Sequence, residues 1–254
     1  MSDVAGPGID AAQLDFSAQR VLVTGAAGGI GSAMARAFHA HGATLLLADR
    51  DRDAMAALAG ELAGAERFGY EQCDADSIAR LVGDAGPVDV LLNNAGMLHV
   101  GPLLDMHAQA IETMVRTNLL GPILLAQGVA RGMVARGHGV ILNTASQIAF
   151  TGGPGRAIYG TTKAGLVQFT RAAGAELAPL GVRVVALAPG RSLTPMTAAA
   201  LADPAYRAQS IARIPAGRLG EAAEMARLAL FLASPLAAYV VGETLIADGG
   251  YVLI

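Results

Sequence analysis

Residue types that build many functional sites are scarce in this chain of 254 residues, which has one cysteine and no tryptophan. The single cysteine, Cys73, excludes a disulfide within the chain. Of the five histidines only His39 and His41 lie close together, and no C-x-x-C pair accompanies them. Because zinc sites need such ligand spacing, we expect no metal site.

The chain also lacks a large excess of charge of one sign and lacks long apolar runs. The 18 Lys and Arg residues are balanced by 21 Asp and Glu residues, so we expect no nucleic-acid partner. No apolar stretch reaches the ~20 residues that span a bilayer without an intervening Gly, Pro or charge, and we expect no membrane partner. Residues 1–16 lack the basic start and apolar run of a secretion signal. We predict a flexible tail over residues 1–17 and a cytoplasmic protein.

Hydrophobic residues, by contrast, make up 53% of the chain, which excludes disorder as its main state. Short apolar runs typical of strands alternate with helical patterns, the order expected of a parallel sheet with crossover helices. Strands are predicted at 20–24, 44–49, 68–73, 88–93, 139–145, 182–188 and 244–247, and helices at 31–40, 52–62, 77–83, 109–135, 157–178 and 221–233. We predict one α/β domain over residues 18–254: a doubly wound, Rossmann-like, seven-stranded parallel sheet with helices on both faces.

One segment, 191–220, has no strong strand pattern and is rich in Pro, Ala and Arg. In a doubly wound sheet it would leave the carboxyl edge, where ligands bind, and we predict a substrate lid there. Its arginines Arg191, Arg207 and Arg213 either recognise a carboxylate or face solvent. We favour solvent for at least two of them.

A glycine-rich turn joins the first predicted strand to the first predicted helix. Residues 21–31 read Val-Leu-Val-Thr-Gly-Ala-Ala-Gly-Gly-Ile-Gly, which places Gly25, Gly29 and Gly31 in a Gly-x-x-x-Gly-x-Gly spacing. Glycines let the backbone approach a pyrophosphate, whose charge is met by free amides at a helix N-terminus. A Walker-type loop is excluded because no Gly-Lys-Ser/Thr follows. The turn indicates a dinucleotide site, with an ordinary tight strand-to-helix connection as the alternative.

An acidic residue supports the dinucleotide interpretation. Asp49 ends the second predicted strand, where a carboxylate accepts hydrogen bonds from the adenosine ribose hydroxyls. The same carboxylate would repel a 2′-phosphate, so we predict NAD rather than NADP. Arg50 and Arg52 are the counter-argument, because an adjacent arginine can hold a phosphate; we favour a solvated helix start for both.

The most informative residue is Lys163, the only lysine in the chain. Tyr159 precedes it by four residues, so on a helix the two side chains share one face. A phenol with a pKa near 10 is a poor base at neutral pH, and a nearby cation lowers that pKa. Ser146 ends a predicted strand and supplies a second hydroxyl. The alternative for any Tyr-x-x-x-Lys is an exposed helical pair, which the glycine turn and the solitary lysine make less attractive.

Together these motifs resemble the short-chain dehydrogenase/reductase family, from Arg20 to the C-terminus. The matching residues are Thr24-Gly-Ala-Ala-Gly-Gly-Ile-Gly31, Asp74, Asn93-Asn-Ala-Gly96, Asn118, Ser146, Tyr159-x-x-x-Lys163, Pro189-Gly190 with Thr194, and Asp248-Gly-Gly250. In this order and spacing they are highly specific. The resemblance implies a homotetramer that binds a nicotinamide cofactor across the carboxyl edge of the sheet.

The resemblance also implies a role for each matching residue. Ser146 would hold the substrate oxygen, Tyr159 would be the general acid/base, and Lys163 would bind the nicotinamide ribose and lower the pKa of the tyrosine. Asn118 would sit at a helix irregularity and position a water for a proton relay, while Asp74 would contact adenine. The cofactor-binding residues implied are Gly25, Gly29, Ile30, Gly31, Asp49, Asp74, Asn94, Ala95, Gly96, Tyr159, Lys163, Pro189, Gly190, Ser192 and Thr194.

Substrate preference is expected to depend on the residues that follow these motifs. Gln147 can donate and accept hydrogen bonds, which suits a small hydroxylated substrate such as a sugar or polyol; the alternative is a side chain turned away from the pocket. The expected substrate-binding residues are therefore Ser146, Gln147 and Tyr159, and the expected enzyme is an NAD-dependent alcohol dehydrogenase or ketone reductase. The alternative is a 3-oxoacyl reductase acting on an acyl-carrier-protein or CoA thioester. The chain resembles such reductases in residues 214–220 and 242–245. Of the two basic docking positions of those reductases, Arg136 matches one, whereas Ala175 stands at the other.

Overall fold

The computed structural model describes residues 11–254. The strands are β1 (Arg20–Thr24), β2 (Thr44–Asp49), β3 (Glu66–Gly69), β4 (Val90–Asn93), β5 (Gly139–Thr144), β6 (Val182–Pro189), β7 (Ser192–Leu193), β8 (Gly220–Glu221) and β9 (Thr244–Ala247). The α-helices are α1 (Gly29–Ala40), α2 (Arg52–Glu61), α3 (Ala75–Asp84), α4 (Ala108–Val115), α5 (Gly121–Arg136), α6 (Ala157–Leu177), α7 (Pro195–Leu201), α8 (Pro204–Ala212) and α9 (Ala222–Ala233).

The main sheet has seven parallel strands in the order β3-β2-β1-β4-β5-β6-β9, which confirms the predicted doubly wound fold. Successive side chains of a strand point to opposite faces. In β1, Val21 and Val23 enter one hydrophobic core while Leu22 enters the other. Because both faces are buried, the central strands are continuously apolar rather than alternating.

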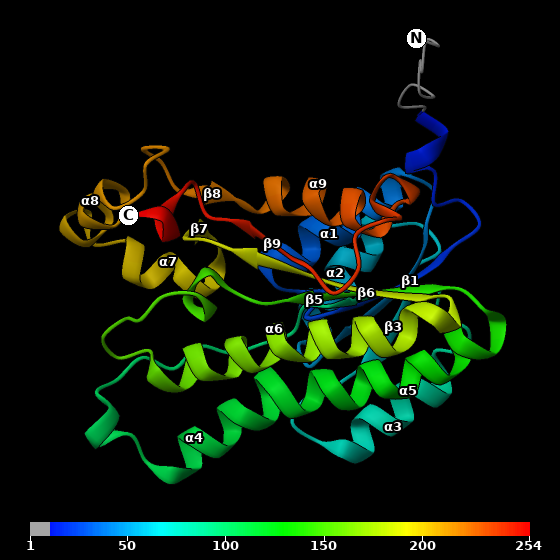
Figure 1. The fold of residues 1–254 in the computed structure, drawn as a ribbon, viewed down its shortest axis with the longest axis horizontal. Helices are drawn as coiled ribbons and strands as arrows, with labels where there is room; N and C mark the ends of the chain where they lie inside the picture. The colour runs from blue at the N-terminus through cyan, green and yellow to red at the C-terminus, as the bar shows by residue number, and fades with distance from the viewer. Residues whose placement is uncertain (1–10) are drawn as a thin grey trace, which may run out of the picture.

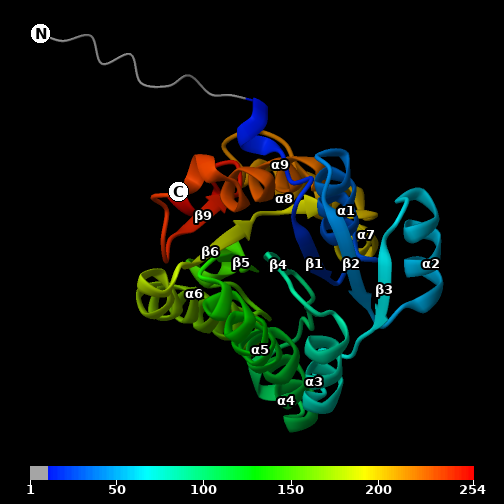
Figure 2. The ribbon, with the colours of Figure 1, turned by 90° about the vertical axis from the view of Figure 1, so that its right-hand side faces the viewer.

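Helices cover both faces of this sheet (Figure 2). Residues of α1, α2 and α9 pack together in one core, represented by Phe38, Met55 and Ala229. Residues of α3, α5 and α6 form the other, represented by Leu81 and Leu125. The reversal of strand order between β1 and β4 leaves a crevice at the carboxyl ends of the strands, the usual ligand position in this fold.

The segment predicted as a lid, 191–220, folds into β7, α7 and α8 before it reaches β8. The two short strands β7 and β8 pair in parallel, Ser192 with Gly220 and Leu193 with Glu221. Figure 1 shows α7 and α8 at the end of the molecule where α6 begins. The segment therefore stands over the carboxyl edge of the sheet as a structured element.

Two predicted elements differ from the structure by more than a shift of one or two residues at an end. The third strand ends at Gly69 instead of residue 73, because Gln72 leaves the sheet and its amide nitrogen donates to the carbonyls of Ala95 and Thr117, at 2.8 and 2.6 Å. The helix predicted over 109–135 is divided by a π-helical segment, Arg116–Leu120. Pro122 supplies the reason, since it has no amide hydrogen to bond the carbonyl four residues earlier.

The predicted tail also needs correction at its C-terminal end. Residues 1–10 lie outside the described part of the chain, whereas Ala11–Leu14 forms a 3-10 helix. Phe16 follows it and is 1% exposed. Its ring meets that of Phe38 edge to face, with the centroids 4.8 Å apart, and its amide donates to the carbonyl of His41 at 2.8 Å. Phe16 thus belongs to the same hydrophobic core as Phe38 of α1.

Within residues 11–254 no helix has the length and apolar character needed to cross a membrane.

The burial of Phe16 leads to a test of where the folded domain begins. We expect Phe16→Ala to lower the free energy of unfolding by about 3 kcal/mol, because it leaves a cavity against Phe38. Tyr239→Ala is the matched control, since Tyr239 is fully exposed. Chemical denaturation measures both. If Phe16→Ala were as stable as the control, residue 16 would belong to the predicted tail and not to the folded domain.

Candidate active site

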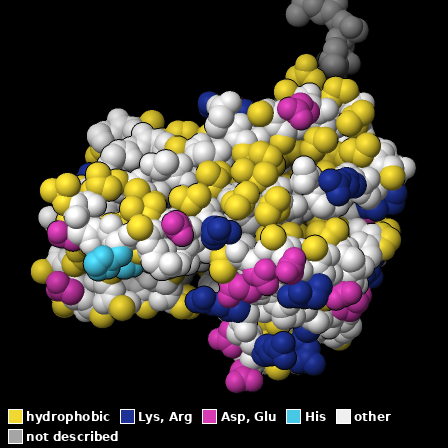
Figure 3. Space-filling model, turned by 90° about the horizontal axis from the view of Figure 1, so that it is seen from below, with side chains coloured by type: hydrophobic (Ala, Val, Ile, Leu, Met, Phe, Trp, Pro, Cys, Tyr) yellow, Lys and Arg dark blue, Asp and Glu magenta, His cyan; other side chains and the backbone are white. Residues whose placement is uncertain are grey.

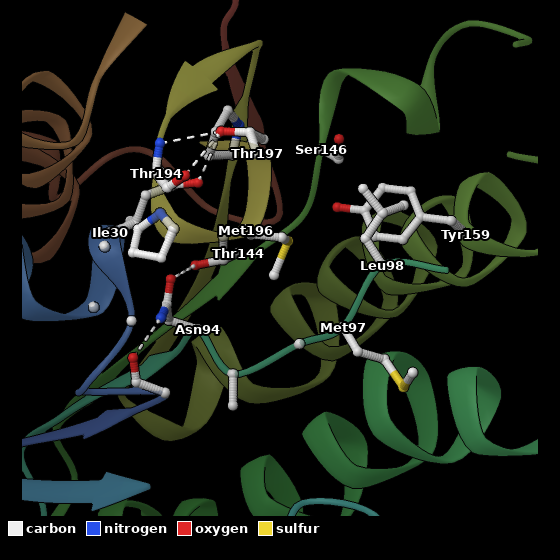
Figure 4. A pocket seen from close by; sticks show the side chains of 18 of the residues that line it. Ile30, Asn94, Met97, Leu98, Thr144, Ser146, Tyr159, Thr194, Met196 and Thr197 are labelled. Carbon is white, nitrogen blue, oxygen red and sulfur yellow. Dashed lines mark hydrogen bonds between the residues drawn. The ribbon is translucent and has the colours of Figure 1, made fainter. Parts of the chain in front are cut away.

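One cavity of about 760 Å³ lies at the carboxyl ends of the strands. The ends of β1, β2, β4, β5 and β6 line it together with α7, α8 and the start of α6. In Figure 4 the Tyr159 oxygen turns toward the middle of this cavity on the side of Ser146, and Ile30, Asn94 and Thr194 lie on the other side. The cavity therefore brings together two groups of predicted site residues that are distant in sequence.

The glycine turn forms one wall of the cavity. Gly25 has a φ of +62°, and a Cβ on it would lie 2.8 Å from the Cα of Ala95. A Cβ on Gly31 would collide with the carbonyl oxygen of Gly25. No side chain caps the N-terminus of α1, whose first residues, Gly29 and Ile30, line the cavity. The first amides of the helix are thus available to an anion, as a pyrophosphate site requires.

Asp49 stands at the adjoining strand end, half-buried against this turn. One carboxylate oxygen accepts from the amide of Ala27 at 3.0 Å, and the other accepts from the amide of Asp51 at 3.1 Å. Arg50 and Asp51 also line the cavity. The acid is therefore held rigidly beside the position that an adenosine ribose would take.

The end of β4 is fixed by hydrogen bonds to β1. The Thr24 hydroxyl accepts from the amides of Asn94 and Ala95, at 3.0 and 3.1 Å. The Asn94 side chain donates to the carbonyl of Thr24 at 3.1 Å, and the Thr144 hydroxyl donates to Asn94 Oδ1 at 3.4 Å. A Cβ on Gly96 would lie 3.5 Å from Lys163 Nζ. The predicted residues 94–96 thus line the cavity between the glycine turn and the lysine.

The predicted Ser146, Gln147 and Tyr159 all line the opposite part of the cavity. Ser146 caps a short 3-10 helix, Gln147–Ala149, through its hydroxyl, which accepts from the amide of Ile148 at 3.3 Å. Burial raises the pKa of the Tyr159 phenol, while a hydrogen bond with Ser146 and the positive charge of Arg156 act to lower it. The phenol is therefore protonated at neutral pH in this state of the protein.

Lys163 lies one turn along α6 from Tyr159 and is 4% exposed. Its ammonium donates to the carbonyl of Thr144 at 2.7 Å and lies 5.9 Å from the centre of the Tyr159 ring. Burial lowers the pKa of Lys163 to about 8. No carboxylate pairs with this ammonium in the described part of the chain. The exposed helical pair that was the alternative interpretation of Tyr-x-x-x-Lys is excluded.

Asn118 lies behind the cavity wall, in the π-helical segment, and is fully buried. Its Oδ1 accepts from the amide of Met97 and its Nδ2 donates to the carbonyl of the same residue, each at 2.8 Å. The predicted helix irregularity at Asn118 is confirmed. Both polar atoms are engaged with the strand-end backbone, which holds the loop next to Gly96.

The residues after β6 complete the cofactor side of the cavity. Pro189, Gly190, Ser192 and Thr194 line it as expected. Thr194 caps α7, and the start of that helix meets the glycine turn, since a Cβ on Gly29 would lie 2.8 Å from the ring of Pro195.

Asp74 is the exception among the predicted cofactor contacts, because it does not line the cavity. Its carboxylate caps α3 by accepting from the amide of Asp76 at 3.0 Å, and it lies 3.7 Å from Arg80. Cys73 and Gln72 occupy that part of the lining instead. Sequence reasoning missed them because the third predicted strand was too long.

Two further lining residues were also missed, Arg156 and Tyr206. Arg156 precedes Tyr159 by three residues, and this helical spacing was the signal that could have identified it as a neighbour of the phenol. Tyr206 lies in α8, where the sequence offers no motif. In contrast, Arg207 and Arg213 of the same segment are exposed, as expected for at least two of its arginines.

Comparisons with known proteins agree with this fold. The family model described as Enoyl-(Acyl carrier protein) reductase matches residues 25–252. The chain is 36% identical to the L-xylulose reductase of Bos taurus, covering 94% of this chain and 98% of that protein. It is 35% identical to the 3-oxoacyl-(acyl-carrier-protein) reductase of Escherichia coli (strain K12), covering 95% of this chain and 100% of that protein.

A solved structure is also similar over nearly the whole chain. It is that of a proposed NAD(P) dependent gluconate 5-dehydrogenase from Beutenbergia cavernae, with NADP bound at low occupancy, and it matches with a TM-score of 0.92 and 35% identity. The match covers 95% of this chain and 100% of that one. The chain therefore belongs to the short-chain dehydrogenase/reductase family, oxidoreductases that act on alcohols and ketones with a nicotinamide cofactor.

Proposed function

We propose that this protein is an NAD-dependent dehydrogenase of secondary alcohols that acts on a small polar substrate such as a sugar or polyol, or on the corresponding ketone. The observation that carries this proposal is the position of Ser146, Tyr159 and Lys163 in one cavity with an uncapped glycine turn. The turn suits a dinucleotide, and the two hydroxyls suit the oxygen of an alcohol.

In the proposed reaction the substrate oxygen lies between Ser146 and Tyr159. Ser146 donates a hydrogen bond to that oxygen and fixes its position. In the direction of oxidation the Tyr159 phenolate accepts the hydroxyl proton, and in the direction of reduction the phenol returns it. A bound nicotinamide supplies the hydride acceptor or donor.

Two cations favour the phenolate form of Tyr159 in this scheme. Arg156 already lowers the phenol's pKa in the structure, although burial outweighs it. Lys163, held by the carbonyl of Thr144, is the second cation of the scheme and would also bind the nicotinamide ribose. Asn118 acts as a positioning residue, because its side chain fixes the backbone at Met97.

The proposed proton transfer is tested by Tyr159→Phe. We expect kcat to fall by roughly 10²–10⁴-fold, since the variant retains the ring but has no proton to exchange. Cofactor affinity, measured by fluorescence titration, should stay unchanged. Tyr239→Phe is the matched control on an exposed tyrosine. Full turnover by Tyr159→Phe would contradict the assignment.

We propose NAD as the preferred nucleotide because of Asp49. Its carboxylate accepts two backbone hydrogen bonds and lines the cavity at the end of β2, where it would repel a 2′-phosphate. Arg50 lies beside it and is exposed. The similar protein from Beutenbergia cavernae binds NADP, so the nucleotide preference of this chain is tested directly.

The measurement compares the two nucleotides on Asp49→Asn. The substitution removes the charge but keeps an oxygen to accept from the Ala27 amide, so the turn should stay intact. We expect the ratio of kcat/KM for NAD to that for NADP to fall by roughly tenfold or more. Asp53→Asn, on the exposed first turn of α2, is the control. An unchanged ratio, or a wild-type enzyme that prefers NADP, would refute the role of Asp49.

A 3-oxoacyl reductase is the second candidate, supported by the 35% identity to the Escherichia coli enzyme. The docking position that sequence comparison suggested for a carrier protein, Arg136, is already engaged. Its guanidinium donates to the carbonyl of Val88 at 2.6 Å and lies 3.4 Å from Asp89. Preferential turnover of a 3-hydroxyacyl thioester over every polyol and hydroxy acid would favour this second candidate.

We also propose a homotetramer. Figure 3 shows hydrophobic side chains gathered in a band across the middle of one face of the molecule, with charged side chains concentrated to one side of it. Val115 and Leu120, in α4 and the π-helical segment, are 36% and 41% exposed. Exposed apolar patches of this kind are typical of protein interfaces.

A further inference from the structure

The cavity extends past Tyr159 to a pair of arginines that the reaction scheme leaves without a ligand. Arg156 immediately precedes α6, and Arg191 lies two residues after the end of β6. Both line the cavity, and so does Tyr206 of α8. Three separate elements thus converge on the substrate side of the phenol.

Tyr206 holds the two guanidinium groups together. Its hydroxyl accepts from Arg191 Nη1 at 3.1 Å and from Arg156 Nη2 at 3.5 Å. Arg191 Nη1 also donates to Ser210 Oγ at 2.9 Å. The guanidinium of Arg191 stacks on the rings of Tyr206 and Tyr251, 5.7 Å from each centroid. Two positive charges are therefore fixed on either side of one phenol oxygen.

Neither arginine has a carboxylate partner among residues 11–254, where the ion pairs involve other side chains. Asp248 lies against Gly190, but its two oxygens accept from the amides of Gly250 and Val252, at 2.9 and 2.8 Å. The charge of this part of the cavity is consequently positive and uncompensated by the chain itself.

Unused hydrogen-bonding groups accompany this charge. The Nε of Arg191 is buried without a partner, and so is the Oε1 of Gln147. Gln147 is 3% exposed and lines the cavity beside Ser146. Buried polar groups are normally satisfied, so unpaired groups at a cavity indicate that a ligand or the closure around it completes their hydrogen bonds.

The position of the charge relates it to the reacting atoms rather than to the dinucleotide. Arg156 lies one helical turn before Tyr159, and its charge acts on that phenol. The nucleotide phosphates are expected at the other wall, where the amides of the glycine turn are free. An anion held by the arginines would thus belong to the molecule that offers its hydroxyl to Tyr159.

We infer that Arg156 and Arg191, bridged by Tyr206, bind a carboxylate of the substrate, so that the preferred substrates are hydroxy acids and the corresponding keto acids. The inference rests on the proposed function and narrows its substrate class. Arginine pairs suit planar carboxylates because each guanidinium presents its donors in a fixed fork. Gln147 is placed to hydrogen-bond a further hydroxyl of such an acid.

The first test compares matched substrates on the wild-type enzyme with NAD. The panel pairs short hydroxy acids and aldonic acids with their amides and with the alditols, and adds sugar phosphates and a 3-hydroxyacyl thioester. We expect kcat/KM for the acids to exceed that for the amides by at least tenfold. Equal or faster turnover of amides, alditols or phosphates would overturn the inference and leave the proposed oxidoreductase standing. No turnover of any panel member with either nucleotide would instead refute the proposed function.

The second test assigns the preference to the arginines. With the best acid, Arg191→Gln should lower kcat/KM by roughly 10²-fold, while the matching amide changes little. Arg156→Gln should lower kcat/KM for both substrates, because Arg156 also favours the Tyr159 phenolate, but the loss should be larger for the acid than for the amide. The dissociation constant for NAD should remain unchanged in both variants. Arg213→Gln is the matched control, because Arg213 also stacks on Tyr251, at 4.9 Å, but is exposed.

Two variants are needed because Arg191 has more contacts within the protein than Arg156, so a loss of activity in Arg191→Gln alone could reflect a change in the fold. An equal loss for acid and amide in both variants, or loss of NAD binding in both, would contradict carboxylate recognition. Thermal unfolding of each variant shows whether the fold persists.

Discussion

The hydrogen bond from the Lys163 ammonium to the carbonyl of Thr144 is the contact on which the rest of the site depends. It ties α6 to the end of β5, and this sets Tyr159 next to Ser146. A buried ammonium without a carboxylate is costly, because burial disfavours its charged form. Groups with strongly shifted pKa values in a cleft are typical of functional sites, and this is the chain's solitary lysine.

Around that contact the cavity is divided by charge. At one end Asp49 and the uncapped start of α1 present an acid and free amides, which suit a ribose and a pyrophosphate. At the other end Arg156 and Arg191 present fixed positive charge. Tyr159 lies between the two ends, where a hydride acceptor and a substrate oxygen would meet. The same asymmetry would orient a dinucleotide and the proposed acidic substrate relative to each other within one cavity.

Much of this arrangement could be predicted from local patterns. The central strands are apolar throughout and end in polar residues, which predicted a doubly wound parallel sheet of seven strands. The resemblance to a known family added most of the residues expected at its carboxyl edge. Local patterns failed where distant contacts decide the backbone: Gln72 leaves β3 to bond Ala95 and Thr117. They failed also at Phe16, whose burial depends on Phe38 of another element.

The substrate end of the site was harder to predict for the same reason. Arg191 and Arg207 look equivalent in the sequence, yet one lines the cavity and the other is exposed. The difference arises from Tyr206 and Ser210 of α8, which bond Arg191. Such a choice between arginines depends on how α8 folds back over the sheet, which residue spacing does not encode.

Burial lowers the pKa of Lys163, and because Lys163 is the only lysine in the chain its titration can be measured directly. Labelling the protein with lysine that carries carbon-13 at Cε gives a single lysine resonance, whose shift can be followed with pH. We expect a titration midpoint near 8. A midpoint at the ordinary value of 10.5 would mean an exposed amine and would contradict the burial of this ammonium in the site.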